Sequence, residues 1–294
     1  MSVIAVIGAG TMGRRLTFDF ARAGHAVSLF DVAPAVGADA MRWLTRTLQL
    51  WEQEGRLTAG AAESALKAVT LRSSLADAVA SADFILENVP ERLALKRALF
   101  AELGSMLGDD AIIVSNTSSL PGSLMADASG RGDRFINANF SHLGHPKVEI
   151  MPHSGTSETT RTRVITLLRE TGFAPLVLRH EQFGYASNRV WRAVKKEVLR
   201  QIDAGIISPQ DLDRGWMHDW EVPLGPCALM DAIGLDVVRD IEQSYADYSG
   251  DPTDSPPPFL EKMVAEGSVG RKSGKGFYSY PNPEFEDPRF LTGT

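Results

Sequence analysis

The chain has 294 residues, a length that predicts two domains, each large enough to bury a core of its own. Its net charge of −7 argues against a nucleic-acid-binding protein, because such proteins carry a surface rich in basic residues. No apolar run approaches the ~18 residues that a membrane span requires. The single cysteine, Cys227, rules out an internal disulfide and is typical of a reducing compartment, so we expect a cytoplasmic protein.

The opening of the chain combines a strand, a glycine-rich turn, a helix and a second strand. The β-branched run at residues 3–7 stops at Gly8-Ala9-Gly10-Thr11-Met12-Gly13, and apolar residues then recur at helical spacing up to Gly24. A second apolar run follows at residues 26–30 and ends in Asp31. This order indicates the first βαβ unit of a dinucleotide-binding domain.

Each glycine of the turn has a mechanical reason to be there. Gly8 permits the tight turn, Gly10 lets the backbone approach a pyrophosphate, and Gly13 lets the helix pack closely on the strand. Asp31 can accept hydrogen bonds from a ribose diol, and its charge repels a 2′-phosphate. We therefore expect NAD rather than NADP as the cofactor.

The rest of the chain predicts an α/β fold, a doubly wound and mostly parallel Rossmann sheet with a second, smaller all-α domain. After Arg179 the strand pattern gives way to helices, so we place an NAD-binding Rossmann domain at residues 1–182 and a helical C-terminal substrate and dimerisation domain at residues 183–294. Apolar surface on the helix expected at residues 188–204 suggests a homodimer. Further strands are expected at residues 84–86, 111–114, 135–140, 148–151 and 175–178, and two helices within residues 35–75.

A series of motifs resembles the 3-hydroxyacyl-CoA dehydrogenase family nearly end to end, including its gulonate dehydrogenase and lambda-crystallin branch. The motifs are the glycine-rich turn, Glu87-Asn88-Val89-Pro90-Glu91 with Lys96, Ser115-Asn116-Thr117-Ser118-Ser119-Leu120, Gly184 with Asn188-Arg189, Gly225-Pro226 with Leu229-Met230-Asp231 and Gly234-Leu235-Asp236, and Gly270-Arg271-Lys272-Ser273-Gly274-Lys275-Gly276-Phe277-Tyr278.

The resemblance implies a role for five of these residues. Glu91 and Lys96 would border the nicotinamide half of the cofactor, and Lys272 would reach in from the closing segment. Ser118 and Asn188 would hydrogen-bond the reacting oxygen of the substrate. The residues themselves leave alternatives open, because Ser118 can be a helix N-cap, Asn188 a hinge cap and Lys272 a solvated charge. The expected cofactor-binding residues are Gly8, Gly10, Thr11, Met12, Gly13, Asp31, Glu91, Lys96 and Lys272.

The expected catalytic base departs from the family pattern. A histidine oriented by a glutamate normally takes the hydroxyl proton, but its position falls on Asn139, whose amide can hold an oxygen and cannot accept a proton. His142 and His145 follow three and six residues later, and the glutamate is retained as Glu149. His142 is the first candidate for the base, with His145 or no histidine as alternatives. Glu149 is expected to be catalytic or to orient the histidine, and a structural ion pair is the alternative.

We expect an NAD-dependent oxidoreductase that transfers a hydride between NAD and a small 3-hydroxyacyl-type substrate, a secondary alcohol beta to an activated or free carboxyl group. Basic residues after the second strand, such as Arg42 and Lys67, are diluted by acids, which weakens the prediction of a CoA tail. The alternatives are a gulonate-like dehydrogenase of a small hydroxy acid and a cofactor-binding protein with altered or lost catalysis. We expect no metal, because hydride transfer needs none and the histidines lack the ligand spacing of a zinc site.

Overall fold

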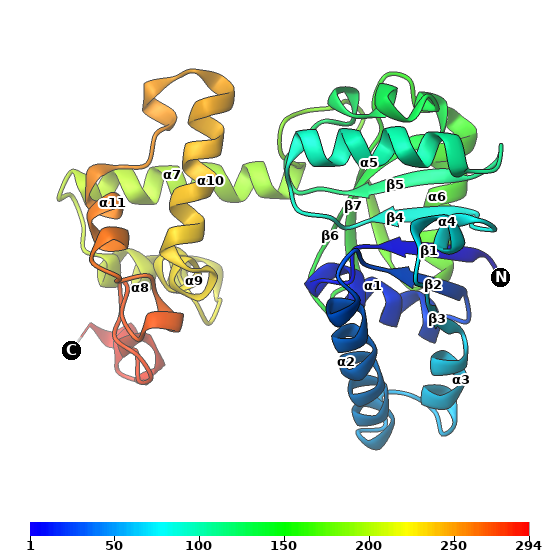
Figure 1. Ribbon diagram of the computed structural model, residues 1–294. Coiled ribbons are helices and arrows are strands. Elements are labelled where there is room, and N and C mark those ends of the chain that lie inside the picture. Colours follow the sequence, from blue (N-terminus) through cyan, green and yellow to red (C-terminus); the bar gives the residue numbers. More distant parts are fainter. Residues whose placement is uncertain (294) are drawn as a thin grey trace. The chain divides into compact units, whose positions relative to one another are not determined.

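The computed structural model describes residues 1–293, and the chain divides into two compact units after Ala186. The first unit holds all eight strands, and the second is helical (Figure 1). The boundary predicted from the sequence, between residues 182 and 183, precedes this point by four residues. No helix in the described part of the chain is long and apolar enough to cross a lipid bilayer.

The first unit is built on a single eight-stranded sheet with the order β3-β2-β1-β4-β5-β6-β7-β8. Every neighbouring pair is parallel except β6 and β7, which are antiparallel. The predicted doubly wound and mostly parallel sheet is therefore confirmed. The strands are β1 (Val3–Ile7), β2 (Ala26–Phe30), β3 (Val69–Leu71), β4 (Phe84–Glu87), β5 (Ile112–Asn116), β6 (Phe135–Phe140), β7 (Lys147–Met151) and β8 (Ala174–Val177).

Helices cover both faces of the sheet, and alternate residues of each strand face opposite layers. Ile4 and Val6 of β1 join the cluster under α1, α2, α3 and α6, whereas Ala5 and Ile7 join the cluster under α4 and α5. The helices are α1 (Thr11–Arg22), α2 (Pro34–Gln53), α3 (Ala61–Lys67), α4 (Leu75–Val79), α5 (Leu93–Met106) and α6 (Glu158–Glu170).

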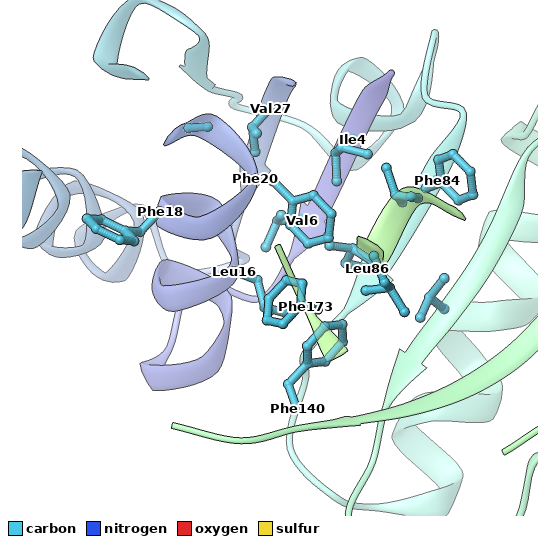
Figure 2. Close-up of a cluster of buried hydrophobic side chains, with 14 of the residues drawn as sticks. Ile4, Val6, Leu16, Phe18, Phe20, Val27, Phe84, Leu86, Phe140 and Phe173 are labelled. Atoms are coloured by element: carbon cyan, nitrogen blue, oxygen red, sulfur yellow. The ribbon is translucent and has the colours of Figure 1, made fainter. Parts of the chain in front are cut away.

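The cluster around α1 fixes this helix on the sheet. Figure 2 shows Leu16 and Phe20 of α1 directed toward Val6, with Phe173 close by, while Phe18 points away from the strands. The Phe18 ring packs edge-on against Trp51 of α2, with ring centroids 4.8 Å apart. Because α1 is held on both sides, its N-terminus lies at a fixed position beside the glycine-rich turn.

Strand β3 was not predicted from the sequence. It has three residues at the edge of the sheet, and only Val69 is buried, so it carries too few apolar positions to produce a pattern. The strands predicted at residues 3–7, 26–30 and 135–140 have those bounds in the structure, and the other predicted strands differ by one or two residues at one or both ends.

The second unit is an assembly of helices closed by an irregular C-terminal segment. Its core joins residues of these helices to Tyr278 and Phe290 of the closing segment. The helices are α7 (Ala186–Asp203), α8 (Pro209–Trp220), α9 (Pro226–Ile233), α10 (Leu235–Ser249) and α11 (Pro258–Ala265), and α7 begins one residue before the division between the units.

Two buried aspartates hold the closing segment of the second unit to its helices. Asp213 of α8 accepts hydrogen bonds from the Cys227 amide at 2.8 Å and the Tyr278 hydroxyl at 2.9 Å. Asp231 of α9 accepts from the Tyr278 amide at 3.0 Å and the Tyr280 hydroxyl at 3.1 Å. Burial raises the pKa of both carboxyls, and these donors oppose that rise by stabilising the charged form.

Candidate active site

The glycine-rich turn has the geometry that dinucleotide binding needs. Gly8 has φ 91°, and a Cβ at this position would lie 2.7 Å from the carbonyl oxygen of Asn88. A Cβ at Gly13 would overlap the carbonyl oxygen of Gly8, so a side chain here would separate α1 from β1. A Cβ at Gly10 would meet nothing within 4 Å, because this backbone faces open space. Gly10 is therefore the glycine whose backbone a ligand can approach.

The N-terminus of α1 is free to receive an anion. Gly10 is its N-cap and supplies no side-chain hydrogen bond, and the first turn, which begins with Thr11 and Met12, contains no acidic residue. The amides of this turn and the helix dipole favour a negative group at this place. The turn thus fits a pyrophosphate.

Asp31 lies directly after β2 and shapes the same turn. Its Oδ2 accepts a hydrogen bond from the Ala9 amide at 2.8 Å, and its Oδ1 accepts from the Ala33 amide at 2.9 Å. The sequence suggested only the second function of this carboxylate, that of a ribose acceptor. Since a carboxylate has about four acceptor positions, Asp31 can fix the turn and still bind a ribose hydroxyl.

A cavity of about 640 Å³ runs along this turn. Its polar end contains Gly8, Gly10 and Asp31, and aliphatic side chains form most of the remaining wall. This combination fits the adenosine half of NAD, with Asp31 at the ribose and apolar contacts for the base. The lining residues that the sequence had not suggested include Val32, Val36, Leu75, Val89, Leu95 and Leu99.

A smaller cavity of about 280 Å³ adjoins the first, since Asn88 and Val89 line both. The lining of this cavity is more polar than that of the first, and it includes several of the residues expected at the reacting end of the cofactor. Its lining residues are Met12, Asn88, Val89, Glu91, Asn116, Ser118, Asn139 and Phe140. The structure thus brings Met12, Glu91, Ser118 and Asn139 together at one cavity.

Glu91 fixes the loop that carries Ser118. Its Oε1 accepts hydrogen bonds from the Thr117 hydroxyl, from the Ser118 amide at 3.0 Å and from the Ser119 amide at 3.2 Å. Ser118 is not a helix N-cap, because the next helical turn, at residues 122–124, begins after Pro121. The alternative interpretation of Ser118 is therefore wrong, and its exposed side chain lies at the cavity.

A buried ion pair beneath Glu91 was missed by the sequence analysis. Lys96 donates to both carboxylate oxygens of Glu87 at 2.8 Å, and neither side chain is exposed. Burial raises the pKa of the Glu87 carboxyl, and Lys96 with the Ser115 hydroxyl at 2.6 Å opposes the rise. The Lys96 ammonium is also 3.4 Å from Glu91 Oε2, so in this structure it reaches the cavity through Glu91 and not directly.

Asn139 and Glu149 are directly opposite each other in the antiparallel ladder of β6 and β7. Side chains of such a pair leave the same face of the sheet, with their Cβ atoms about 4.5–5.5 Å apart. Glu149 is buried, and the Lys147 ammonium lies 3.6 Å from its Oε2. Glu149 therefore forms an ion pair with Lys147, and the register of the ladder places it opposite the asparagine that lines the cavity.

The two candidate histidines lie on the loop between β6 and β7. Arg15 of α1 holds this loop by donating to the Ser141 and His145 carbonyl oxygens. The His142 and His145 rings have centroids 4.0 Å apart, and both side chains are exposed. Partial desolvation, with the neighbouring His145 and Arg15, lowers the pKa of His142, which keeps its imidazole neutral at pH 7. Neither histidine lines the cavity that contains Asn139.

Two of the expected site residues, Asn188 and Lys272, lie in the second unit. Asn188 is the third residue of α7 and is partly buried. The Lys272 ammonium lies 2.6 Å from Asp236 Oδ2 in an ion pair, and its side chain is half exposed. The proposed contacts of Asn188 with substrate and of Lys272 with cofactor stay predictions.

Sequence comparison assigns both parts of the chain to one family. Residues 3–182 match the NAD-binding domain of 3-hydroxyacyl-CoA dehydrogenase, and residues 184–280 match its C-terminal domain. The chain belongs to the 3-hydroxyacyl-CoA dehydrogenase family. It is an NAD-dependent oxidoreductase that transfers hydride between the cofactor and a hydroxyacyl-type substrate.

Similar proteins include members with different substrates in their names. The chain is 30% identical over 282 residues to 5-formyl-3-hydroxy-2-methylpyridine 4-carboxylate 5-dehydrogenase of Mesorhizobium japonicum, covering 94% of this chain and 90% of the relative. It is 32% identical over 277 residues to a probable 3-hydroxybutyryl-CoA dehydrogenase of Deinococcus radiodurans, with 94% and 99% covered. The crystal structure of (S)-3-hydroxybutyryl-CoA dehydrogenase from Ralstonia eutropha superposes with a TM-score of 0.90 at 29% identity, covering 96% of this chain and all of that one.

Proposed function

We propose that the protein oxidises a secondary alcohol beta to a carboxyl or thioester group, with the reacting carbon in the cavity of Ser118 and Asn139. The observation that carries this proposal is that the polar cavity adjoins the larger cavity that fits the adenosine half of NAD, since Asn88 and Val89 line both. When bound, NAD accepts the hydride in the oxidation and returns it in the reduction.

The side chains of this cavity suit a substrate oxygen. The Ser118 hydroxyl and the Asn139 amide can each donate a hydrogen bond to it and so hold the alcohol or the carbonyl in place. Glu91 keeps Ser118 in position through the loop contacts, and Lys96 in turn fixes Glu91. The chain thus supplies binding and orientation at this end of the cofactor.

The proton of the alcohol needs an acceptor that Asn139 cannot be. We propose that Glu149 is this acceptor: the O–H bond breaks, its electron pair forms the carbonyl, and the proton passes to the carboxylate, directly or through one water. Glu149 is favoured because its strand register places it opposite Asn139. His142 is the second candidate, favoured by its neutral imidazole and dependent on a movement of its loop.

Two hypotheses for the substrate are a CoA thioester and a free hydroxy acid. Basic side chains of the α2–α3 region form exposed ion pairs with nearby acids, Arg42 with Asp39 and Lys67 with Glu63. Cations already paired in this way attract phosphates less strongly, which favours the free acid. The gulonate-like alternative is also a free hydroxy acid.

The test of this function is steady-state NADH production with 3-hydroxybutyryl-CoA, free 3-hydroxybutyrate and gulonate. Turnover of any of them supports the proposal, and the ranking identifies the substrate form. With the best substrate, Glu149→Gln should lower kcat by about 10²–10⁴ and leave NADH affinity unchanged. His142→Asn should change kcat by no more than about threefold, and His145→Asn is its matched control. A collapse of kcat in His142→Asn with full activity in Glu149→Gln would reverse the assignment.

We further propose that the protein is a cytoplasmic homodimer that associates through its second unit. Support comes from large apolar side chains on this unit that are well exposed in the single chain. Val190 is 68% exposed, Ile206 71% and Trp220 64%, and an interface with a second copy would remove this apolar surface from water.

A further inference from the structure

The larger cavity is lined by a carboxylate that has no part in the glycine-rich turn, that of Glu102 on α5. Among residues 1–293, the polar side chains that line this cavity are those of Asp31, Asn88 and Glu102. Asp31 accepts the two backbone amides described above, and Asn88 donates to the Leu86 carbonyl oxygen at 2.9 Å. The Glu102 carboxylate forms no hydrogen bond or ion pair within the described residues. It is therefore an acceptor that a bound molecule can use.

Glu102 belongs to the same face of α5 as the apolar wall of the cavity. Leu95, Ala98, Leu99 and Glu102 all line the cavity, and their spacing of three and four positions places them in one stripe along the helix. Side chains of a helix lean toward its N-terminus, which in α5 is at Leu93, just after the loop that follows β4. The Glu102 carboxylate is therefore directed back along this stripe, toward the apolar wall.

The apolar part of the cavity suits a flat aromatic base. Val32 and Val36 line it just beyond Asp31, and Leu95 and Leu99 line it from α5. When Asp31 holds the ribose of the adenosine half, the attached base enters this part of the cavity. Adenine carries one exocyclic donor, its 6-amino group, which loses hydrogen bonds to water when apolar side chains surround it. Glu102 is the residue of the apolar wall that can replace them.

We propose that the Glu102 carboxylate accepts a hydrogen bond from the 6-amino group of the adenine of NAD and makes the cofactor site selective for adenine. A base with a carbonyl oxygen at this position presents an acceptor to the carboxylate, which is itself an acceptor, and the two groups repel each other. Glu102 is thus a specificity-determining residue for the cofactor. The inference rests on NAD as the cofactor and holds whichever substrate the protein oxidises.

The test compares the Kd of NADH with the Kd of reduced nicotinamide hypoxanthine dinucleotide, which has a carbonyl oxygen in place of the 6-amino group. The fluorescence of the reduced nicotinamide reports the binding of both, so the measurement needs no turnover. The wild-type protein should bind NADH about tenfold more tightly, which corresponds to one hydrogen bond to a charged group. Because both dinucleotides have the same charge, the ratio of their Kd values cancels the general repulsion between the cofactor and nearby acids.

Glu102→Ala should reduce this ratio to about twofold or less, because it removes both the hydrogen bond to the amine and the repulsion of the carbonyl. Glu102→Gln should reduce it as well, because an amide can accept from an amine and donate to a carbonyl. The melting temperature should stay the same in both variants, since the carboxylate has no partner within residues 1–293.

Asp109→Ala is the matched control. It removes an exposed negative charge three residues beyond the end of α5 and outside the lining of the cavity, so it should keep the wild-type ratio. A wild-type ratio near one, or a ratio near tenfold in Glu102→Ala, overturns the inference. Selectivity that depends on Glu102, in a protein that turns over no β-hydroxy substrate, supports the inference and refutes the proposed function.

Discussion

Replacing Lys96 by methionine should destabilise the first unit far more than an ordinary loss of an ion pair. The change leaves the Glu87 carboxylate with 0% exposure and without its cation. Removing one partner of a buried pair costs about 3–5 kcal/mol, because the remaining charge is neither solvated nor neutralised. The control is Lys67→Met, which breaks an exposed pair with Glu63 of 2.6 Å length; it should cost about 0.2–1 kcal/mol.

The loss of stability in Lys96→Met should depend on pH, and its direction follows from the pKa of Glu87. The pKa of Glu87 is already raised in the folded protein, and loss of Lys96 raises it further. Between the unfolded pKa of about 4.3 and the folded pKa, the folded state binds more protons, so the stability of the variant falls as pH rises through this window. Below about pH 4.3 the carboxyl is protonated in both states and the deficit is smallest.

Urea unfolding followed by circular dichroism at pH 5 and pH 8 measures these differences. The transition of the first unit is the one that NADH shifts to higher urea. The double variant Glu87→Gln/Lys96→Met should recover about 1–3 kcal/mol of the loss, since the uncompensated charge is gone. A cost for Lys96→Met no larger than that of Lys67→Met, with no dependence on pH, would refute the reasoning.

Two further predictions concern the cofactor. Gly10→Ala should reduce NADH affinity at least tenfold and leave the melting temperature nearly unchanged. Gly13→Ala should instead lower the melting temperature, because of these two positions only Gly13 would bring the new Cβ into overlap with backbone. Calorimetry and NADH titration separate the two effects, and equal melting temperatures would contradict the packing argument. The wild-type protein should bind NADH more tightly than NADPH, because the Asp31 carboxylate repels the 2′-phosphate of NADPH. Asp31→Ala should narrow this difference in affinity and weaken the binding of both cofactors, because Asp31 also fixes the turn through the Ala9 amide. Fluorescence titration with both cofactors measures the affinities, and tighter NADPH binding by the wild type would refute the repulsion at Asp31.

The fold could be predicted from the sequence where local pattern and tertiary environment agree. The strand at residues 3–7 and the turn from Gly8 to Gly13 follow from β-branched residues, glycine spacing and the acid at the end of the next strand. Short edge elements such as β3 could not be predicted, since one buried residue gives no periodicity.

The candidate site was predicted less completely, for a physical reason. Glu87 ends an apolar strand and Lys96 lies nine positions later on a helix, and the motif that contains both residues does not show that they pair. The pairing depends on the packing of α5 on the sheet. Similarly, the sequence cannot show which way a loop turns. Arg15, which lies far from the histidines in the chain, decides where the loop of His142 is held.

The ladder between β6 and β7 has a consequence for how this protein can evolve. Hydrogen bonds of the strands, and not the loop after β6, set the distance between positions 139 and 149. The loop can therefore drift in sequence while an acid stays opposite position 139. Asparagine and histidine codons differ by a single base, so one point mutation at Asn139 would put an imidazole opposite Glu149. The histidine–glutamate arrangement that the family resemblance implies is thus one mutational step away.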